Sequence, residues 1–240
     1  MSTLLLRLAA PLQSWGTDSR FDTRRTERLP SKSGVIGLIA AALGLRRDAD
    51  LSELCALRFG VRVDRDGELL RDYHTAHHET DEKRAYVTNR YYLADAVFTV
   101  GLESNDERFL ASLDQALRAP VYPLFLGRRS CPPTLPLSLG VRNADLYTSL
   151  KAEPWQISEY LAEKWKQRNR GKTPMLRIVT DEYPGAGNRA VLRDLPASFD
   201  PCGRRYGFRA ASDIGYIAPP GFEAGADLTE HDPFSELEAD

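Results

Sequence analysis

The first part of the chain alternates short apolar runs with polar loops, and each run has the spacing of a strand or a helix. Residues 3–9 (TLLLRLA) and 57–63 (LRFGVRV) have the length and the apolar character of strands. Between them, Ser31 or Ser33 supplies the N-cap of a helix that runs to about Leu45. The pattern therefore predicts the order strand, helix, strand.

The same kind of pattern continues over the next sixty residues. Asp66-Gly67 is typical of a hairpin turn, and residues 86–102 form a long run rich in β-branched and aromatic residues. Ser104 is expected to cap a helix with acidic residues in its first turn, and residues 121–127 (VYPLFLG) are expected to form another strand. Together these elements predict an α+β domain with the ferredoxin-like order βαββαβ.

The composition of the chain changes after this domain. We expect the ferredoxin-like domain to span 1–127, with an inserted β-hairpin at about 69–92. From residue 128 the sequence is rich in proline and then alternates strand patterns with Gly/Pro turns, which predicts a β-rich C-terminal extension over 128–222. Residues 223–240 are expected to be an acidic tail.

Net charge is uneven along the chain. The chain has 32 basic and 34 acidic residues, but eight of the acidic residues and none of the basic ones follow Arg209. Residues 1–209 therefore carry 32 basic against 26 acidic residues, a positive balance that suits a polyanionic partner. No segment approaches the roughly 18 apolar residues of a membrane span, and Arg7 breaks the N-terminal run that a signal peptide would need, so we expect a cytoplasmic protein.

The loop RLPSKSGVIG (28–37) runs into an apolar helix, as anion-binding loops do. A nucleotide-hydrolysing loop needs the pattern GxxxxGK[ST], and here no glycine precedes Lys32 and Ser33. Two interpretations remain. The helix N-terminus could bind a phosphate oxygen of a nucleic acid, with Arg24, Arg25 and Lys32 beside it, or a serine could simply cap a core helix.

Three of the four histidines lie in the segment YHTAHHE: His74, His77 and His78. A metal site is one hypothesis, but the segment lacks the helical HExxH spacing. A second is an endoribonuclease in which a histidine acts as general base or acid beside Tyr73. The third, which we favour, is an RNA-contacting hairpin whose tyrosines offer stacking faces beside basic side chains.

The segment PLFLGRRSCPP (123–133) contains two candidate chemistries. Cys131 invites a nucleophile interpretation, but the prolines that follow exclude the helix that would activate a thiol. Arg128 and Arg129, directly after Gly127, are expected to contact the backbone or the bases of a nucleic acid. The three cysteines of the chain are scattered, which argues against a disulfide framework and against a CxxC metal site.

Several of these segments together resemble one protein family. The segments LLLRLAAPLQSWG, PSKSGVIGLIAAALG, RYYLADAVFTVGL and YPLFLGRRSCPP, spread over residues 4–133, occur in this order in the CasD family of type I-E CRISPR Cascade subunits. The region RAVLRDLP…RRYGFR is similar to the C-terminal part of the same family. Each segment alone is a weak signal, and the ordered set is specific.

This resemblance implies a non-catalytic, repeat-associated RNA-binding protein with an RRM-related ferredoxin-like domain and a β-hairpin thumb. In the family, the protein caps the guide-RNA filament, holds the 5′ handle of the CRISPR RNA, and lies beside the backbone subunits and the large subunit. It meets target DNA only through the complex. The alternative, carried by relatives of another subtype, is a metal-independent endoribonuclease that processes repeat RNA.

On this basis we expect no cofactor, no metal ligand, no catalytic residue and no membrane contact. The residues expected to contact RNA are Arg20, Arg24, Arg25, Lys32, Ser33, Tyr73, His77, Tyr86, Arg90, Arg128, Arg129 and Cys131.

Overall fold

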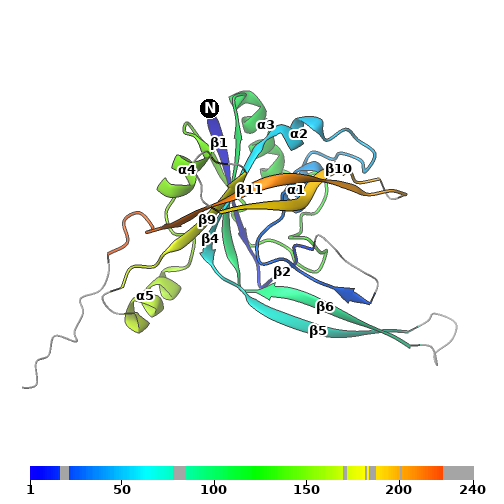
Figure 1. Cartoon of the computed structure of the whole chain (residues 1–240), viewed down its shortest axis with the longest axis horizontal. Coiled ribbons are helices and arrows are strands. Elements are labelled where there is room, and N and C mark those ends of the chain that lie inside the picture. The colour runs from blue at the N-terminus through cyan, green and yellow to red at the C-terminus, as the bar shows by residue number, and fades with distance from the viewer. Residues whose placement is uncertain are drawn as a thin grey trace, which may run out of the picture.

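A computed structural model gives the arrangement of the chain (Figure 1). It describes residues 1–16, 22–77, 85–169, 172–181, 183, 188–200 and 202–223. The acidic tail predicted from residue 223 lies outside the described residues except for Glu223. Among the helices of the described part, none has the length and apolar character that crossing a membrane requires.

A seven-stranded sheet forms the centre of the molecule, in the order β10-β11-β9-β4-β7-β1-β8. Every neighbouring pair in it is antiparallel. The two halves of the chain share this sheet, because β9 pairs with β4 at one side and β8 pairs with β1 at the other. The strands are β1 (Ser2–Ala9), β4 (Arg58–Arg65), β7 (Val97–Ser104), β8 (Ser138–Arg142), β9 (Leu176–Asp181), β10 (Asn188–Ser198) and β11 (Arg205–Ile217).

Helices cover both faces of this sheet. On one face, the apolar sides of α1 (Lys32–Ala42), α2 (Ser52–Ala56) and α3 (Glu107–Arg118) form the main core with alternate residues of β1, β4 and β7. On the other face, α4 (Leu146–Ala152) forms a smaller core with Leu5 and Ile178. Gly101 lets α4 approach the sheet closely, since a Cβ there would lie 2.5 Å from Leu146 Cδ1. A fifth helix, α5 (Glu159–Arg168), follows α4 in the chain.

Polar side chains fix the ends of the helices. Ser31 is the N-cap of α1, and its hydroxyl accepts a hydrogen bond from Gly34 N. The cap predicted at Ser104 is wrong, because Asp106 caps α3 and Ser104 Oγ accepts from Asp106 N. A capping carboxylate satisfies a free amide and also complements the positive end of the helix dipole.

The second sheet is built around a long hairpin of β5 (Glu68–His77) and β6 (Ala85–Ala94), which projects from the body (Figure 1). The hairpin predicted over about 69–92 coincides with these strands. Two short strands, β2 (Leu12–Gln13) and β3 (Thr23–Arg24), pair with β6 and join the root of the hairpin to the N-terminal segment.

The strand predicted at 121–127 is wrong. These residues form a loop, and the strand that follows α3 is β8, which pairs with β1. Val121 and Tyr122 are exposed, and the amides of both bond to carbonyls at the end of α1 instead of to a strand. The apolar pattern of this segment instead reflects Leu124 and Leu126, which pack on the main core. The domain boundary predicted between residues 127 and 128 falls in the loop between α3 and β8. The strands before this loop and the strands after it belong to one continuous sheet.

A fully buried ion pair holds the loop after α4 onto the sheet. Neither side chain of the Arg62–Asp64 pair exposes any surface, and Nη2 of Arg62 lies 2.7 Å from Asp64 Oδ1. Arg62 also donates to the carbonyls of Leu150, Glu153 and Pro154. A buried guanidinium is tolerable only with such complete pairing.

We expect Asp64→Ala to lower the free energy of unfolding by about 3–5 kcal/mol, because it leaves the Arg62 charge buried without its counterion. Denaturant titration of the full chain measures this loss. The matched control is Asp48→Ala, which removes an exposed partner 3.8 Å from Arg46 and should change stability by less than about 0.5 kcal/mol. Equal losses in the two variants would contradict the assignment.

Candidate nucleic-acid interface

The N-terminus of α1 is satisfied from inside the protein. Lys32 N donates to Asp194 Oδ2 at 2.8 Å, Gly34 N donates to Ser31 Oγ, and Val35 N donates to the Ser31 carbonyl. The carboxylate of Asp194 therefore occupies the position at which an external phosphate would bind the helix dipole. Of the two interpretations of the loop 28–37, the geometry favours the capped core helix.

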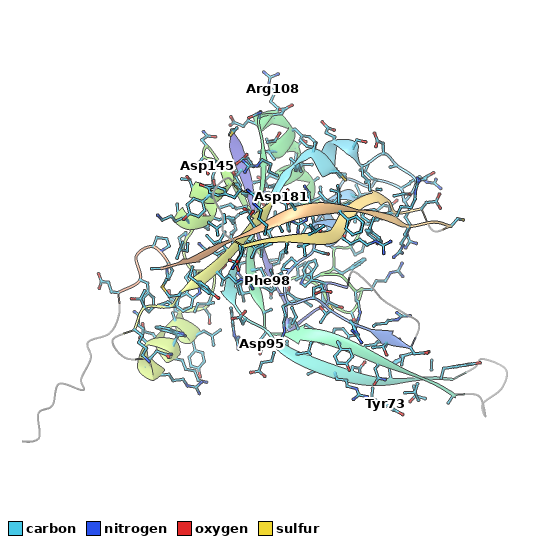
Figure 2. All side chains as sticks on the ribbon, in the orientation of Figure 1. Tyr73, Asp95, Phe98, Arg108, Asp145 and Asp181 are labelled. Carbon is cyan, nitrogen blue, oxygen red and sulfur yellow. The ribbon has the colours of Figure 1, made fainter. Side chains whose placement is uncertain are left out.

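Lys32 belongs to the same internal network, and its assignment to an RNA contact is corrected. It is 4% exposed, and its ammonium donates to the Leu57 carbonyl at 2.7 Å and to Asp181 Oδ2 at 3.0 Å. Arg209 completes the network through contacts with Asp181 (2.8 Å) and Asp194 (2.7 Å). Figure 2 shows Asp181 near the centre of the molecule, where the C-terminal strands join the rest of the sheet through β9 and β4. The Lys32 ammonium is therefore committed to the fold.

A groove of about 990 Å³ runs along α1 beside this network. Ser33, Gly34 and Gly37 line it from the helix, so Ser33 does reach a concave surface. Four arginines and five aromatic residues also line the groove, together with Asp48 and Asp200: Arg46, Arg47, Arg129, Arg204, Trp15, Tyr122, Phe125, Phe199 and Tyr206. Cationic side chains beside aromatic rings suit a single-stranded polyanion with stacking bases.

Of these residues, the sequence alone identified Ser33 and Arg129. The other arginines and aromatic residues come from the N-terminal segment, the loop after α1, the loop after α3, the segment between β10 and β11 and the start of β11, which no local pattern brings together. The one available signal was the Arg46-Arg47 pair, which resembles an ordinary helix C-terminus with basic residues in its last turn.

A tight turn over residues 126–131 holds the two consecutive arginines. Leu126 N donates to the Cys131 carbonyl at 2.8 Å, and Cys131 N donates to the Arg128 carbonyl at 2.9 Å. Gly127 has φ +86°, and a Cβ on it would lie 1.6 Å from the Ser14 carbonyl oxygen. Only glycine fits this conformation and this approach.

Cys131 anchors this turn from the core, and its assignment to an RNA contact is corrected as well. The residue is 1% exposed, and burial raises the pKa of its thiol. A buried, protonated thiol neither reaches RNA nor acts as a nucleophile at neutral pH. Cysteine is frequent in protein cores, and here it acts as a small apolar residue.

The two arginines of the turn serve different surfaces. Arg129 is exposed and lines the groove. Arg128 lies over the ring of Tyr92, with Cζ 4.5 Å from the ring centroid, and its Nη2 donates to the Arg24 carbonyl at 2.9 Å. The turn thus places one guanidinium in the groove and the other at the root of the hairpin.

The hairpin separates residues that sequence reasoning grouped together. Since side chains alternate along a strand, Tyr86, Arg90 and Tyr92 share one face of β6. Tyr73 pairs with Asn89 and therefore lies on the opposite face. Figure 2 shows Tyr73 on the outer side of the hairpin, and it is 65% exposed. Tyr73 and Tyr86, which is 60% exposed, thus offer two separate stacking surfaces.

The remaining candidates lie around the hairpin root or beyond the described residues. Arg24 and Arg25 are exposed next to the hairpin root. Arg20 lies outside the described residues, and of His77 only the backbone is described, as the last residue of β5. The described part of the chain contains no group of three or more His, Cys, Asp or Glu side chains that could hold a metal ion.

Comparison with known proteins identifies a family that the chain matches. The model of the family described as CRISPR-associated protein (Cas_Cas5) matches residues 3–212, which include every residue that lines the groove. Over 163 residues the chain is 41% identical to the CRISPR system Cascade subunit CasD of Escherichia coli (strain K12), an alignment that covers 60% of this chain and 72% of that protein.

Two solved structures are also similar to the chain. One is a chain of a CRISPR RNA-guided surveillance complex, with a TM-score of 0.76 and 35% identity over 94% of this chain and 95% of the other. The second is a crystal structure of a Cas protein, with a TM-score of 0.67 and 38% identity over 90% of this chain and 95% of the other.

We expect Gly127→Ala to destabilise the full chain by more than about 3 kcal/mol, because the new methyl group would collide with backbone at a positive φ. The matched control is Gly203→Ala, where a Cβ meets nothing within 4 Å and the change should stay within about 1 kcal/mol. Thermal unfolding compares the two. Similar melting temperatures would show that the turn yields easily and does not position its arginines.

We expect Cys131 to resist alkylation in the folded protein at pH 8, because burial both raises its thiol pKa and blocks the reagent. Cys202 is exposed and serves as the internal control. Mass spectrometry after iodoacetamide treatment, with and without denaturant, reads each site separately. Modification of Cys131 as fast as Cys202 without denaturant would contradict its role as a buried anchor.

Proposed function

The chain belongs to the Cas5 family of CRISPR-associated proteins, and we propose that it is a CRISPR RNA-binding subunit of a Cascade surveillance complex. The observation that carries this proposal is the match, over almost the whole chain, to a chain of an RNA-guided surveillance complex. The close similarity to a Cascade subunit supports it from the sequence side.

The basic groove and the hairpin are the surfaces we assign to the RNA. Arginine side chains neutralise phosphates, while exposed tyrosines accept the faces of unpaired bases. In the groove, Arg129 and Arg204 lie within one concavity with Tyr122 and Tyr206. On the hairpin, Tyr73 and Tyr86 expose most of their surface although neither contributes to the core. These contacts recognise the backbone and the shape of the RNA. Sequence recognition is not required of them, because base pairing by the guide selects the target.

Within the complex, we assign the chain to the 5′ handle of the CRISPR RNA, at one end of the guide filament. Its neighbours there are the backbone subunits and the large subunit, and target DNA is reached only through the assembled particle. We assign the protein to the cytoplasm, where guide RNA and invading DNA meet.

We propose further that the role is non-catalytic. The rival function, a metal-independent endoribonuclease, needs a general base and a general acid on the same ribose. Tyr73 and His74 are consecutive residues of β5, so their side chains point to opposite faces of the hairpin. Cys131 is buried in the core. This arrangement supports binding in preference to cleavage.

We also propose that β1, α1, β4, β7, α3 and β8 form the ferredoxin-like unit of the protein. Its support is the strand order β4-β7-β1-β8, antiparallel throughout, which is the order of a βαββαβ fold. The hairpin β5–β6 would then be an insertion between its second and third strands. In this scheme the unit extends to Arg142, so the boundary of the first domain moves beyond residue 127.

Co-purification tests the proposed function. The tagged full chain is expressed with a CRISPR array and the other subunits of the complex, and the bound RNA is sequenced. Guide RNAs that carry the repeat-derived handle should be enriched. Isolation of the complex without such RNA would contradict the proposal, as would specific cleavage of labelled repeat RNA by the purified chain without divalent metal.

We expect Arg129→Ala and Arg204→Ala each to weaken binding of single-stranded repeat RNA and to reduce the slope of log K against log salt by about 0.7 for each lost phosphate contact. The matched control is Arg108→Ala, since Figure 2 shows this exposed arginine at the end of the molecule away from the hairpin. Fluorescence anisotropy at several salt concentrations gives both quantities. An unchanged slope in both groove variants would exclude the groove from phosphate binding.

A further inference from the structure

Two buried donor atoms in the described part of the chain have no hydrogen-bond partner: Nε of Arg90 and Nη1 of Arg128. Buried polar atoms in native proteins are almost always paired, so each exception calls for an explanation. The cost is largest for atoms that carry charge, and here both belong to guanidinium groups. Both residues are only half-buried, so a ligand that accepts hydrogen bonds can approach the two guanidinium groups from the solvent side.

The fold brings these two side chains to the same place. Arg90 and Tyr92 lie two residues apart on one face of β6, and the guanidinium of Arg128 lies over the Tyr92 ring. Arg128 also bonds to the carbonyl of Arg24, the residue that pairs with Arg90 across the β3–β6 ladder. Both arginines therefore meet at the root of the hairpin, next to β3.

Arg128 is held in this position before any ligand arrives. Its carbonyl accepts from Cys131 N, and the preceding glycine fits against Ser14 without room for a side chain. Ser14 is linked in turn to β6, because its hydroxyl donates to the Tyr91 carbonyl. Because the turn is already ordered, binding of the ligand would not include the entropy loss of ordering it, which is the usual advantage of a preorganised site.

We propose that Arg90 and Arg128 together bind one phosphate group of the RNA at the root of the hairpin, an inference that rests on the proposed function. Guanidinium groups bind phosphate oxygens through several parallel N–H donors, and two of them can share one phosphate. A base is the poorer fit at this point, because Tyr92 is only 5% exposed and Arg128 lies over its ring. The exposed Tyr86, farther along the same face, is where a neighbouring base can stack.

The test is a double-mutant cycle between protein and RNA. Single methylphosphonate linkages, which lack the phosphate charge, are placed in turn along repeat-derived single-stranded RNA. Binding is measured for the full wild-type chain and for Arg90→Gln and Arg128→Gln. One linkage should weaken wild-type binding about tenfold when neutralised, the loss expected for a charged hydrogen bond, and should have no further effect in either variant.

Arg71→Gln is the matched control. Arg71 pairs with Tyr91 on the opposite face of the same hairpin, and its Nε donates to Asn89 Oδ1. In this variant, neutralising the sensitive linkage should still weaken RNA binding about tenfold. RNA prepared with a 5′-phosphate or with a 5′-hydroxyl distinguishes a terminal phosphate from an internal linkage, and coupling at either supports the site.

The inference is overturned if each neutral linkage weakens RNA binding by the same factor in wild type, Arg90→Gln and Arg128→Gln. Thermal unfolding checks that the variants fold. If Arg128→Gln is unstable because it loses the bond to Arg24, then Arg90→Gln decides the matter, since the donor removed there has no partner in the protein. Failure of the wild-type chain to bind repeat RNA at all would instead overturn the proposed function.

Discussion

The buried network of Lys32, Asp181, Asp194 and Arg209 is the interaction on which the arrangement of this protein depends. It joins the first turn of α1 to the strands β9, β10 and β11, which come from the other half of the sequence. Two cations face two carboxylates, and one of those carboxylates also satisfies a helix amide. Removal of Asp181 would leave Lys32 without a counterion, and removal of Arg209 would do the same to Asp194, so the four residues act as one unit. The groove exists because this unit fixes α1 beneath the C-terminal strands.

The same network explains why the helix N-terminus is closed to an external anion. Asp194 supplies from within the molecule what a phosphate would supply from outside. The side chains that the fold leaves accessible for the proposed RNA contacts are Arg129 and Arg204 along the groove and the tyrosines of the hairpin. The turn over residues 126–131 connects these surfaces, because its two arginines point to different sides of a single rigid backbone element.

The sequence predicted the elements whose patterns are local. The strand at 3–9, the helix capped at Ser31 and the hairpin on either side of residues 78–84 follow from apolar spacing, capping chemistry and turn residues. The sequence failed where tertiary packing decides. Residues 121–127 look like a strand because Leu124 and Leu126 are apolar core contacts, although the amides of the segment bond to the end of α1. Lys32 looks like a phosphate ligand because its partner Asp181 is 149 residues away.

The site was predicted less completely for the same reason. Cys131 stood beside two arginines, and only its burial shows that it supports their backbone. Tyr73 and Tyr86 seemed to belong together until the register of β5 and β6 put them on opposite faces. Arg46, Arg47 and Arg204 could not be joined to Arg129 from spacing, since the groove gathers them from three separate segments. The family resemblance identified the kind of ligand, and the register and burial determine which residues can touch it.

The shared sheet has a consequence for synthesis of the chain. Both outer sides of the three strands β4, β7 and β1 are completed by partners that are translated later: β8 at residues 138–142 and β9 at 176–181. Until those residues leave the ribosome, the growing chain presents two open strand edges, which are templates for pairing with other chains. Pairings so distant in sequence also form slowly. Co-translational folding of the first half therefore has to wait for the second, and the exposed nascent sheet is a natural substrate for chaperones.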